Sequence, residues 1–353
     1  MKVSAVLSRG TAPSELVDAE LDEPRSDEVI VRIEAVGVCH TDLVTRQRLG
    51  ERPAVLGHEG CGTVAHLGSA VEGLAVGDRV VISFASCGGC AKCRAGLPGY
   101  CAWATALNGA GRRLDGSPTV RVKGEPVFGA FFGQSSFATA ALADARSCVR
   151  VGDVPPAVVA PLGCGFLTGA GAVLNVLRPR PGDRLLVVGA GGVGSAAALT
   201  ALSEGVEVLV AEPVAARRTL PEQCGATVFA SLDEPMPPVT HVLDTTGRPE
   251  AIVRALGLLQ PCGALALVGL GPAEVTLDAR SLMLRGLRIH GCVEGDADPP
   301  VLVPELIRRY RDGSLPLDRL VTTYPLAELD RAVADHRAGL TTKPVLLPDG
   351  RPT

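Results

Sequence analysis

The distribution of apolar residues along the chain changes near its middle. Up to about residue 150, apolar residues form short runs broken by Gly and Pro, as at residues 28–33 and 78–82. This pattern predicts an irregular, mostly β domain. From about residue 165 to 293 the order strand, glycine turn, helix, strand recurs, which is typical of a parallel α/β sheet. An amphipathic helix is predicted around residues 302–310, in a C-terminal stretch that is too short to fold alone and should pack onto the first domain.

Length and composition agree with two domains. The chain has 353 residues, of which 46% are hydrophobic, and it can therefore bury a large core. A sequence pI of about 5.9 and the lack of a basic run speak against nucleic acid as a partner. The apolar start at residues 3–7 is too short for a signal peptide or a membrane span, so we expect the first strand of a cytoplasmic protein.

Eleven cysteines in a reducing compartment indicate metal binding rather than disulfides. Four of them stand in a C-x2-C-x2-C-x7-C run, which comprises Cys87, Cys90, Cys93 and Cys101. Thiolates this close together would form strained disulfides, whereas together they make the tetrahedral S4 cage of a structural Zn²⁺. Five other cysteines lack ligand-like spacing, and we interpret them as small core or surface residues: Cys61, Cys148, Cys224, Cys262 and Cys292.

The α/β half begins with a glycine-rich turn. A buried strand at residues 184–188 leads into Gly189-Ala190-Gly191-Gly192-Val193-Gly194, and an alanine-rich helix follows. The glycines at 189, 191 and 194 permit a tight turn, a close approach to a pyrophosphate and close packing of helix on strand. The sequence therefore predicts a dinucleotide-binding turn.

A second strand, at residues 207–211, ends at Glu212. A carboxylate at that place bonds both ribose hydroxyls and repels a 2'-phosphate, which favours NAD over NADP. Arg217 and Arg218 follow closely and would weaken this preference.

Three further segments place a thiolate or an imidazole beside glycines, where the chain can bend. They contain Cys39, His58 and Cys164. Taken singly, such a cysteine is more often a core residue and such a histidine more often a hydrogen-bonded one. Taken together they make the Cys2His set of an open, catalytic zinc site with water or substrate in the fourth position.

The cage, the turn and this ligand set together resemble the zinc-containing medium-chain dehydrogenases/reductases. Gly57-His58-Glu59-Gly60-Cys61-Gly62, followed by Gly68 and Val71, matches the zinc signature of that family. The resemblance covers essentially the whole chain. It implies an α/β protein with two domains. A GroES-like, mostly-β catalytic domain comprises residues 1–165 and 294–353 and carries a structural zinc lobe at about residues 85–105. A Rossmann coenzyme domain, residues 166–293, interrupts it. The active site would lie in the cleft between them.

Within that family, four phrases look closest to the aryl (benzyl) alcohol dehydrogenases. They begin at Cys39, Phe131, Pro161 and Val293. This likeness implies an NAD-dependent enzyme that interconverts a primary aromatic or allylic alcohol and its aldehyde. A set of phenylalanines near the expected pocket favours an aromatic substrate: Phe84, Phe131, Phe132 and Phe137.

The resemblance also assigns roles around the catalytic zinc. Thr41 matches the hydroxyl that takes the substrate proton, and Asp42 is expected to bond His58 and fix its tautomer. Glu59 matches a carboxylate behind the metal. For Asp42 and Glu59 the alternative is a plain surface or capping carboxylate. Val44 stands where many relatives have a relay histidine, so the proton would pass through a ribose hydroxyl either to water or to His40.

Further roles concern the coenzyme. His40 and Lys343 match positions that contact the pyrophosphate, and Thr168 matches a position beside the nicotinamide ring. Segments around Val268, and around Cys292 and Glu294, would line the carboxamide through their backbone. We expect two Zn²⁺ per chain, a small-molecule substrate, no nucleic-acid or membrane partner, and a homodimer or homotetramer.

Three alternatives stay open from the sequence. The first is a thiol-adduct formaldehyde dehydrogenase, which acts on a hydroxymethyl thiol and needs a polar or charged pocket. The second is a biosynthetic reductase of a larger aldehyde. The third is a non-enzymatic scaffold, since fold does not imply function. Such scaffolds commonly lose zinc ligands, whereas Cys39, His58 and Cys164 are all present.

Overall fold

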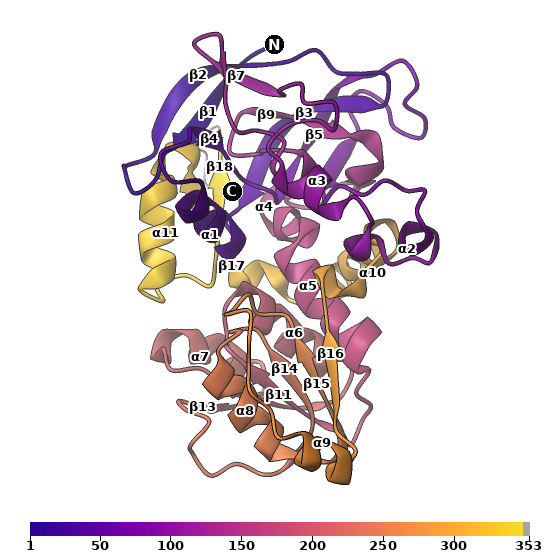
Figure 1. Cartoon of the computed structure of the whole chain (residues 1–353), viewed down its shortest axis with the longest axis vertical. Coiled ribbons are helices and arrows are strands. Elements are labelled where there is room, and N and C mark those ends of the chain that lie inside the picture. Colours follow the sequence, from indigo (N-terminus) through magenta and orange to yellow (C-terminus); the bar gives the residue numbers. More distant parts are fainter. Residues whose placement is uncertain (349–353) are drawn as a thin grey trace.

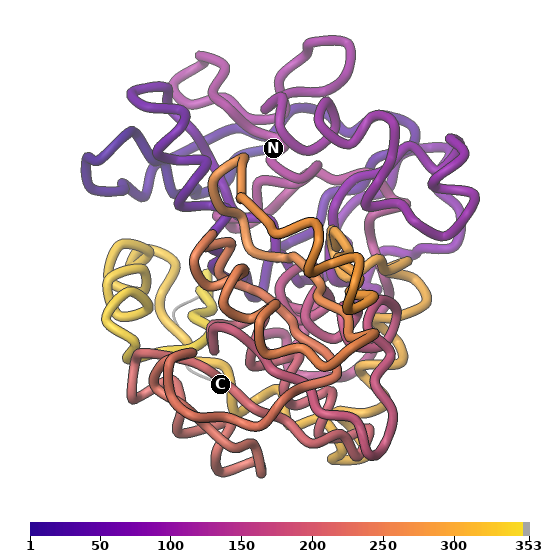
Figure 2. Tube along the Cα trace, turned by 60° about the horizontal axis from the view of Figure 1, so that its bottom comes forward, coloured from indigo at the N-terminus to yellow at the C-terminus, as the bar shows by residue number. Residues whose placement is uncertain are grey.

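The computed structural model describes residues 1–348, and the chain forms two bodies that follow one another along its long axis (Figure 1). The first body contains the N-terminal half and the C-terminal segment, and the second contains the middle of the chain. In the turned view of Figure 2 the middle segments stay together on one side of the N-terminal strands. Residues 349–353 of the expected catalytic domain lie outside the described residues.

The first body is built on two sheets, as the broken apolar runs predict. One has five strands in the order β4-β1-β2-β7-β8, and the other has seven, in the order β10-β6-β5-β3-β18-β17 with β9 on β3. Their bounds are β1 (Lys2–Ser8), β2 (Glu15–Leu21), β3 (Glu28–Gly37), β4 (Ala54–Val55), β5 (Gly60–Leu67), β6 (Arg79–Ile82), β7 (Val120–Val122), β8 (Glu125–Pro126), β9 (Ala140–Asp144), β10 (Cys148–Arg150), β17 (Val321–Pro325) and β18 (Lys343–Leu347).

Strand β3 shows why this part of the sequence folds as it does. It pairs with β5, β9 and β18, and most of its residues are buried. A strand with neighbours along both edges and cover on both faces needs branched apolar residues throughout, which explains the run at residues 28–33. The pairing of β18 with β3 also brings the C-terminal segment back to the first body.

Short helices connect these strands. They are α1 (His40–Leu49), α2 (Ala91–Arg94), α3 (Ala104–Gly109), α4 (Pro156–Val159), α10 (Pro299–Arg311) and α11 (Leu329–Arg337). Helix α10 confirms the amphipathic helix predicted around residues 302–310, and it buries Leu302, Val303 and Leu306.

The second body is a six-stranded parallel sheet with strand order β13-β12-β11-β14-β15-β16. This is the doubly wound order of dinucleotide-binding folds, in which ligands bind at the carboxyl ends of the strands where the order reverses. Its elements are β11 (Arg184–Val188), α6 (Gly192–Ser203), β12 (Glu207–Ala211), α7 (Ala215–Gln223), β13 (Thr227–Phe229), β14 (Val239–Asp244), α8 (Pro249–Leu258), β15 (Leu259–Leu267), α9 (Ala279–Arg285) and β16 (Arg288–Gly291).

A shared apolar core joins the two bodies. It includes Val81 of β6, Leu167 of α5 (Gly165–Gly171) and Leu306 of α10, all of them buried. Because α5 leaves the first body and packs against α6 of the second, the residues at its start lie between the two sheets. Cys164 and Thr168 are therefore held at the junction.

The described residues contain no single helix with the length and apolar character of a membrane span. One helix pair, Pro156–Gly163 with Gly165–Leu177, reaches that length and composition only across a 64° bend.

Candidate active site

Cys39, His58 and Cys164 come from separate turns and meet at one point. Cys39 directly precedes α1, His58 lies between β4 and β5, and Cys164 forms the turn before α5. Their ligand atoms and a carboxylate oxygen of Glu59 all lie within 4.8 Å of one another. A single tetrahedral cation can span donors at this spacing.

The imidazole of His58 is oriented for metal binding. The Oδ1 atom of Asp42 lies 2.9 Å from His58 Nδ1, which is the contact expected from the sequence, and it also accepts the Gly57 N–H at 3.0 Å. With Nδ1 held by the carboxylate, the lone pair of Nε2 is free. Among the described residues this buried Nε2 atom has no hydrogen-bond partner. A buried, unpartnered nitrogen facing two thiols fits Zn²⁺.

Glu59 lies behind this cluster in a buried ion pair with Lys343. The Lys343 Nζ atom is 2.5 Å from Glu59 Oε2 and donates to the Val38 carbonyl at 3.0 Å, while Glu59 Oε1 accepts the Gly165 N–H at 3.0 Å. Burial raises the pKa of the Glu59 carboxyl to about 7, and the Lys343 ammonium opposes that rise. The alternative of a surface carboxylate is therefore wrong for Glu59.

Lys343 was expected at the coenzyme pyrophosphate, and its charge is engaged by Glu59 in this structure. Its side chain nevertheless passes close to the glycine-rich turn, because a Cβ placed on Gly192 would meet Lys343 Cδ at 3.4 Å. Contact with a pyrophosphate stays a prediction.

Two aromatic rings flank His58. Phe132 stacks on the imidazole with a centroid distance of 4.5 Å, and Phe131 meets it edge-on at 5.2 Å. The other two candidates lie elsewhere in the core: Phe84 packs in the cluster shared by the two bodies, and Phe137 packs against Gly57.

The helix that starts after Cys39 carries the candidate proton route. The Thr41 hydroxyl lies 3.8 Å from the Cys39 sulfur. His40 and Val44 are exposed on α1. A hydroxyl therefore lies beside the candidate metal ligand Cys39, and the side chain one turn further along the helix, Val44, is apolar.

The cysteine cage is a second candidate metal site. The sulfurs of Cys87, Cys90, Cys93 and Cys101 lie within 4.8 Å of one another, and all four cysteines are free of disulfides. Backbone N–H groups of Cys87 and Trp103 donate to the Cys101 sulfur at 3.3 and 3.4 Å. Amide donors of this kind stabilise thiolates and thus a bound cation.

The glycine-rich turn has the shape that a pyrophosphate needs. Gly189 has a φ of +92°, which a side chain would strain, and a Cβ on Gly194 would lie 1.9 Å from the Gly189 carbonyl oxygen. A Cβ on Gly191 would meet nothing within 4 Å, so the space in front of the helix start is open. Helix α6 begins at Gly192 with Val193 next to it, and its first N–H groups face that space.

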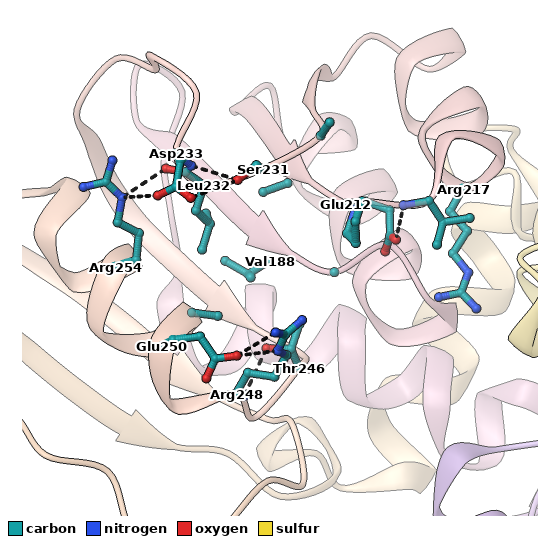
Figure 3. Close-up of a pocket in the computed structure, with 16 residues that line it drawn as sticks. Val188, Glu212, Arg217, Ser231, Leu232, Asp233, Thr246, Arg248, Glu250 and Arg254 are labelled. Atoms are coloured by element: carbon teal, nitrogen blue, oxygen red, sulfur yellow. Dashed lines mark hydrogen bonds and ion pairs between the residues drawn. The ribbon is translucent and has the colours of Figure 1, made fainter.

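A cavity of about 610 Å³ adjoins this turn at the carboxyl ends of β11 and β12 (Figure 3). Glu212 lies at its edge and accepts the N–H groups of Ala190 and Val214 at 2.8 and 2.9 Å. The two arginines that follow Glu212 closely in sequence both donate to backbone carbonyls. Arg217 donates to His336, and Arg218 donates to Glu212 and Pro213. Only Arg217 of these two lines the cavity.

The expected nicotinamide contacts lie at the junction of the two bodies. Thr168 is buried in α5, and its hydroxyl lies 3.2 Å from Oε2 of Glu294. Val268 continues β15, and its N–H donates to the Asp244 carbonyl at 2.9 Å. Glu294 was considered only for its backbone, but its carboxylate also lies 3.6 Å from the Cys164 sulfur.

Some residues of this site are not among the candidates predicted from the sequence. Gln134 donates to the His58 carbonyl at 2.9 Å and accepts the Gly60 N–H at 3.0 Å, so it fixes the loop that carries the histidine. Gln134 lies in the phrase beginning at Phe131 that resembles the aryl alcohol dehydrogenases, so the sequence could have indicated it. Tyr100 contacts the segment of Glu294, and in the sequence only its position next to Cys101 relates it to the site.

Family comparisons agree with this geometry. A family model described as "Alcohol dehydrogenase GroES-like domain" matches residues 25–153, and one described as "Zinc-binding dehydrogenase" matches residues 192–309. The geraniol dehydrogenase of Castellaniella defragrans is 41% identical to this chain, over 98% of this chain and 97% of its own.

Solved structures agree as well. An alcohol dehydrogenase zinc-binding domain protein from Burkholderia ambifaria superposes with a TM-score of 0.94 at 38% identity, and each chain is covered to 99%. Benzyl alcohol dehydrogenase from Acinetobacter calcoaceticus gives a TM-score of 0.93 at 36% identity, covering 98% of this chain and 99% of that one. The expected fold class, a GroES-like domain with a Rossmann domain, is confirmed. The chain belongs to the zinc-containing medium-chain alcohol dehydrogenases, which are oxidoreductases that act on CH–OH groups.

Proposed function

We propose that this enzyme interconverts a primary alcohol whose carbinol carbon adjoins a π system, either aromatic or allylic, and the corresponding aldehyde, with NAD as hydride acceptor. The observation that carries the proposal is the stacking of Phe132 on His58, which places an aromatic wall beside the unpartnered Nε2 atom. Two relatives are named for geraniol and benzyl alcohol, and both compounds are alcohols of this class.

The chain's own residues would hold the metal. Cys39, His58 and Cys164 would supply three donors to Zn²⁺, which would leave room for a substrate oxygen as the remaining ligand. Bound there, the cation supplies a Lewis acid that lowers the pKa of an alcohol. Asp42 keeps the proton on His58 Nδ1 and so keeps Nε2 available as a ligand.

Other residues would orient the coenzyme and the proton. The N–H groups at the start of α6 would bind the pyrophosphate, and the Glu212 carboxylate at the end of β12 would favour NAD by repelling a 2'-phosphate. Thr41 would take the substrate proton at its Oγ1 and pass it towards solvent, where His40 is exposed. Thr168 would pack beside the nicotinamide ring, which the coenzyme supplies as hydride acceptor.

The remaining assignments follow from the same proposal. Cys87, Cys90, Cys93 and Cys101 would hold a second, structural Zn²⁺. The catalytic domain would comprise residues 1–165 and 294–353 and the coenzyme domain residues 166–293. We also propose a homodimer or homotetramer.

A substrate panel tests the proposal. Zinc-loaded enzyme is assayed with NAD and with NADP on benzyl alcohol, cinnamyl alcohol, geraniol and ethanol, and on formaldehyde with and without glutathione. We expect kcat/KM for the aromatic and allylic alcohols to exceed that for ethanol by at least tenfold, with NAD preferred. Turnover of formaldehyde only with the thiol, and none of benzyl or cinnamyl alcohol, would instead assign a hydroxymethyl-thiol dehydrogenase.

A further inference from the structure

The segment that carries Glu294 into the active site has an unusual backbone. Three consecutive residues have left-handed conformations: φ is +52° at Glu294, +70° at Gly295 and +47° at Asp296. Residues other than glycine rarely adopt this region, so neighbouring contacts must hold such a turn in place. We call residues 293–296 the left-handed turn.

One side of the left-handed turn is packed against α5. A Cβ on Gly295 would lie 2.7 Å from the Leu167 carbonyl oxygen and 2.9 Å from Gly171 Cα, so the two backbones touch. The Asn175 side chain also donates to the Gly295 carbonyl at 3.0 Å.

The other side of the left-handed turn is held by one residue of the cysteine-cage lobe. The Tyr100 hydroxyl donates to Asp296 Oδ1 at 2.7 Å, accepts the Val293 N–H at 3.2 Å and lies 3.1 Å from the Gly291 carbonyl oxygen. Gly99, the residue before Tyr100, also packs closely against the turn. A Cβ on Gly99 would meet the Val293 carbonyl oxygen at 3.0 Å.

These contacts connect the two metal sites. Tyr100 directly precedes the cage ligand Cys101, whose sulfur accepts N–H groups from within the lobe. The end of β16, which leads into the left-handed turn, thus lies against the lobe that bears α2 (Figure 1). Between the two residues of the turn that Tyr100 contacts, Val293 and Asp296, the Glu294 carboxylate reaches Thr168 and Cys164.

We propose that Tyr100 is a positioning residue for the active site: it transmits the geometry of the cysteine cage to the left-handed turn and so keeps the Glu294 carboxylate against Thr168 and Cys164. The inference rests on the proposed function for its catalytic consequence, although the positional part stands without it. The cage then stabilises the fold and also shapes the pocket.

The test uses Tyr100→Phe in the full-length, zinc-loaded enzyme, because this change keeps the ring and removes only the hydroxyl. Tyr310→Phe is the matched control, since Tyr310 is also half-buried but lies on α10 and makes none of these contacts. Hydrogen–deuterium exchange of the Val293, Asp296 and Ala297 amides reports the left-handed turn directly. We expect faster exchange there in Tyr100→Phe and unchanged exchange in strand β11 and in the control.

Kinetics test the consequence for the pocket. With benzyl alcohol and NAD, Tyr100→Phe should lower kcat about three- to tenfold, the scale of one lost hydrogen bond, with KM for the alcohol within about twofold. If Tyr100 acts through Glu294, then in a Glu294→Gln background the same change should lower kcat less than about twofold. Tyr310→Phe should have no effect in either background.

The outcomes are separable. Unchanged amide exchange in Tyr100→Phe would overturn the positional claim whether or not the enzyme turns over any alcohol. If Tyr100→Phe speeds amide exchange in the left-handed turn but lowers kcat by the same factor in the wild-type and Glu294→Gln backgrounds, Tyr100 does not act through Glu294. A wild-type enzyme that oxidises none of the alcohols would refute the proposed function, and the exchange data would still decide whether Tyr100 holds the left-handed turn.

Discussion

Lys343 and Glu59 form an ion pair beside the cluster of Cys39, His58 and Cys164, with Nζ 2.5 Å from Oε2 and both side chains almost fully buried. The ammonium comes from the start of β18, and the carboxylate directly follows His58. This contact links the C-terminal segment to the loop that carries a metal ligand.

The ion pair predicts a strong effect on stability. Lys343→Met should lower the free energy of unfolding by about 3–5 kcal/mol, because it leaves a buried carboxylate without its partner. Urea unfolding measures the change. The double variant Lys343→Met/Glu59→Gln should recover most of the loss, and a Lys343→Met protein that unfolds at the wild-type urea concentration would contradict the account.

The hydrogen bond between Asp42 and His58 predicts an effect on zinc affinity. Asp42→Asn should weaken binding at the catalytic site by about 10- to 100-fold, because the imidazole loses the carboxylate that fixes its tautomer. Competition with a chelator measures the affinity. Zinc retained in the cysteine cage is the internal control, and an unchanged affinity at the catalytic site would refute the role given to Asp42.

Glu212 predicts the coenzyme preference. Glu212→Gln should raise the ratio of kcat/KM for NADP to that for NAD by about tenfold or more, since like charges about 4 Å apart repel by about 1–4 kcal/mol. Glu222→Gln, an exposed glutamate of α7, is the matched control. A ratio that moves equally in both variants would show that Glu212 does not select the coenzyme.

The cage predicts how zinc binding depends on pH. Backbone N–H groups of Ala102 and Cys93 lower the pKa of Cys90 to about 6, whereas burial and the hydrogen bond to Cys90 raise the pKa of Cys93 to about 11. At neutral pH a cation must displace the Cys93 proton, and below pH 6 it must displace the Cys90 proton as well.

Zinc affinity of the cage should therefore fall with decreasing pH, and the slope should steepen by about one log unit per pH unit below about pH 6. The measurement uses chelator competition on Cys39→Ser, which removes a ligand of the other site. A slope that stays constant across pH 6 would contradict the thiolate assignment of Cys90.

The sequence predicted the cage, the three ligands of the open site and the glycine turn because each depends on local spacing or on residue type. A C-x2-C-x2-C run brings thiols together almost regardless of context. At residues 189 and 194 glycine is required because a side chain would be strained or would clash within the turn itself. The repeated strand and helix pattern predicted the parallel sheet of the second body, whereas its Rossmann fold was implied by the resemblance to the family.

Other parts of the site depend on contacts between distant segments, which no local pattern encodes. Tyr100 and Asp296 are 196 residues apart in sequence, and their contact requires both bodies to be folded. The left-handed conformation of Glu294 could not be predicted, because the sequence offers a glycine only at the next position. Likewise, the buried ion pair of Lys343 with Glu59 joins segments far apart in the chain, and no local pattern predicted it.

The proposed reaction passes a hydride from the carbinol carbon of an aromatic or allylic alcohol to NAD at the site of Cys39, His58 and Cys164. The most direct measurement incubates the zinc-loaded enzyme with benzyl alcohol bearing two deuterium atoms on the carbinol carbon, and follows NAD by mass spectrometry. We expect reduced coenzyme with one deuterium and aldehyde with the other, and neither product from a folded Cys164→Ala variant. Reduced coenzyme without deuterium, or equal transfer by Cys164→Ala, would contradict it.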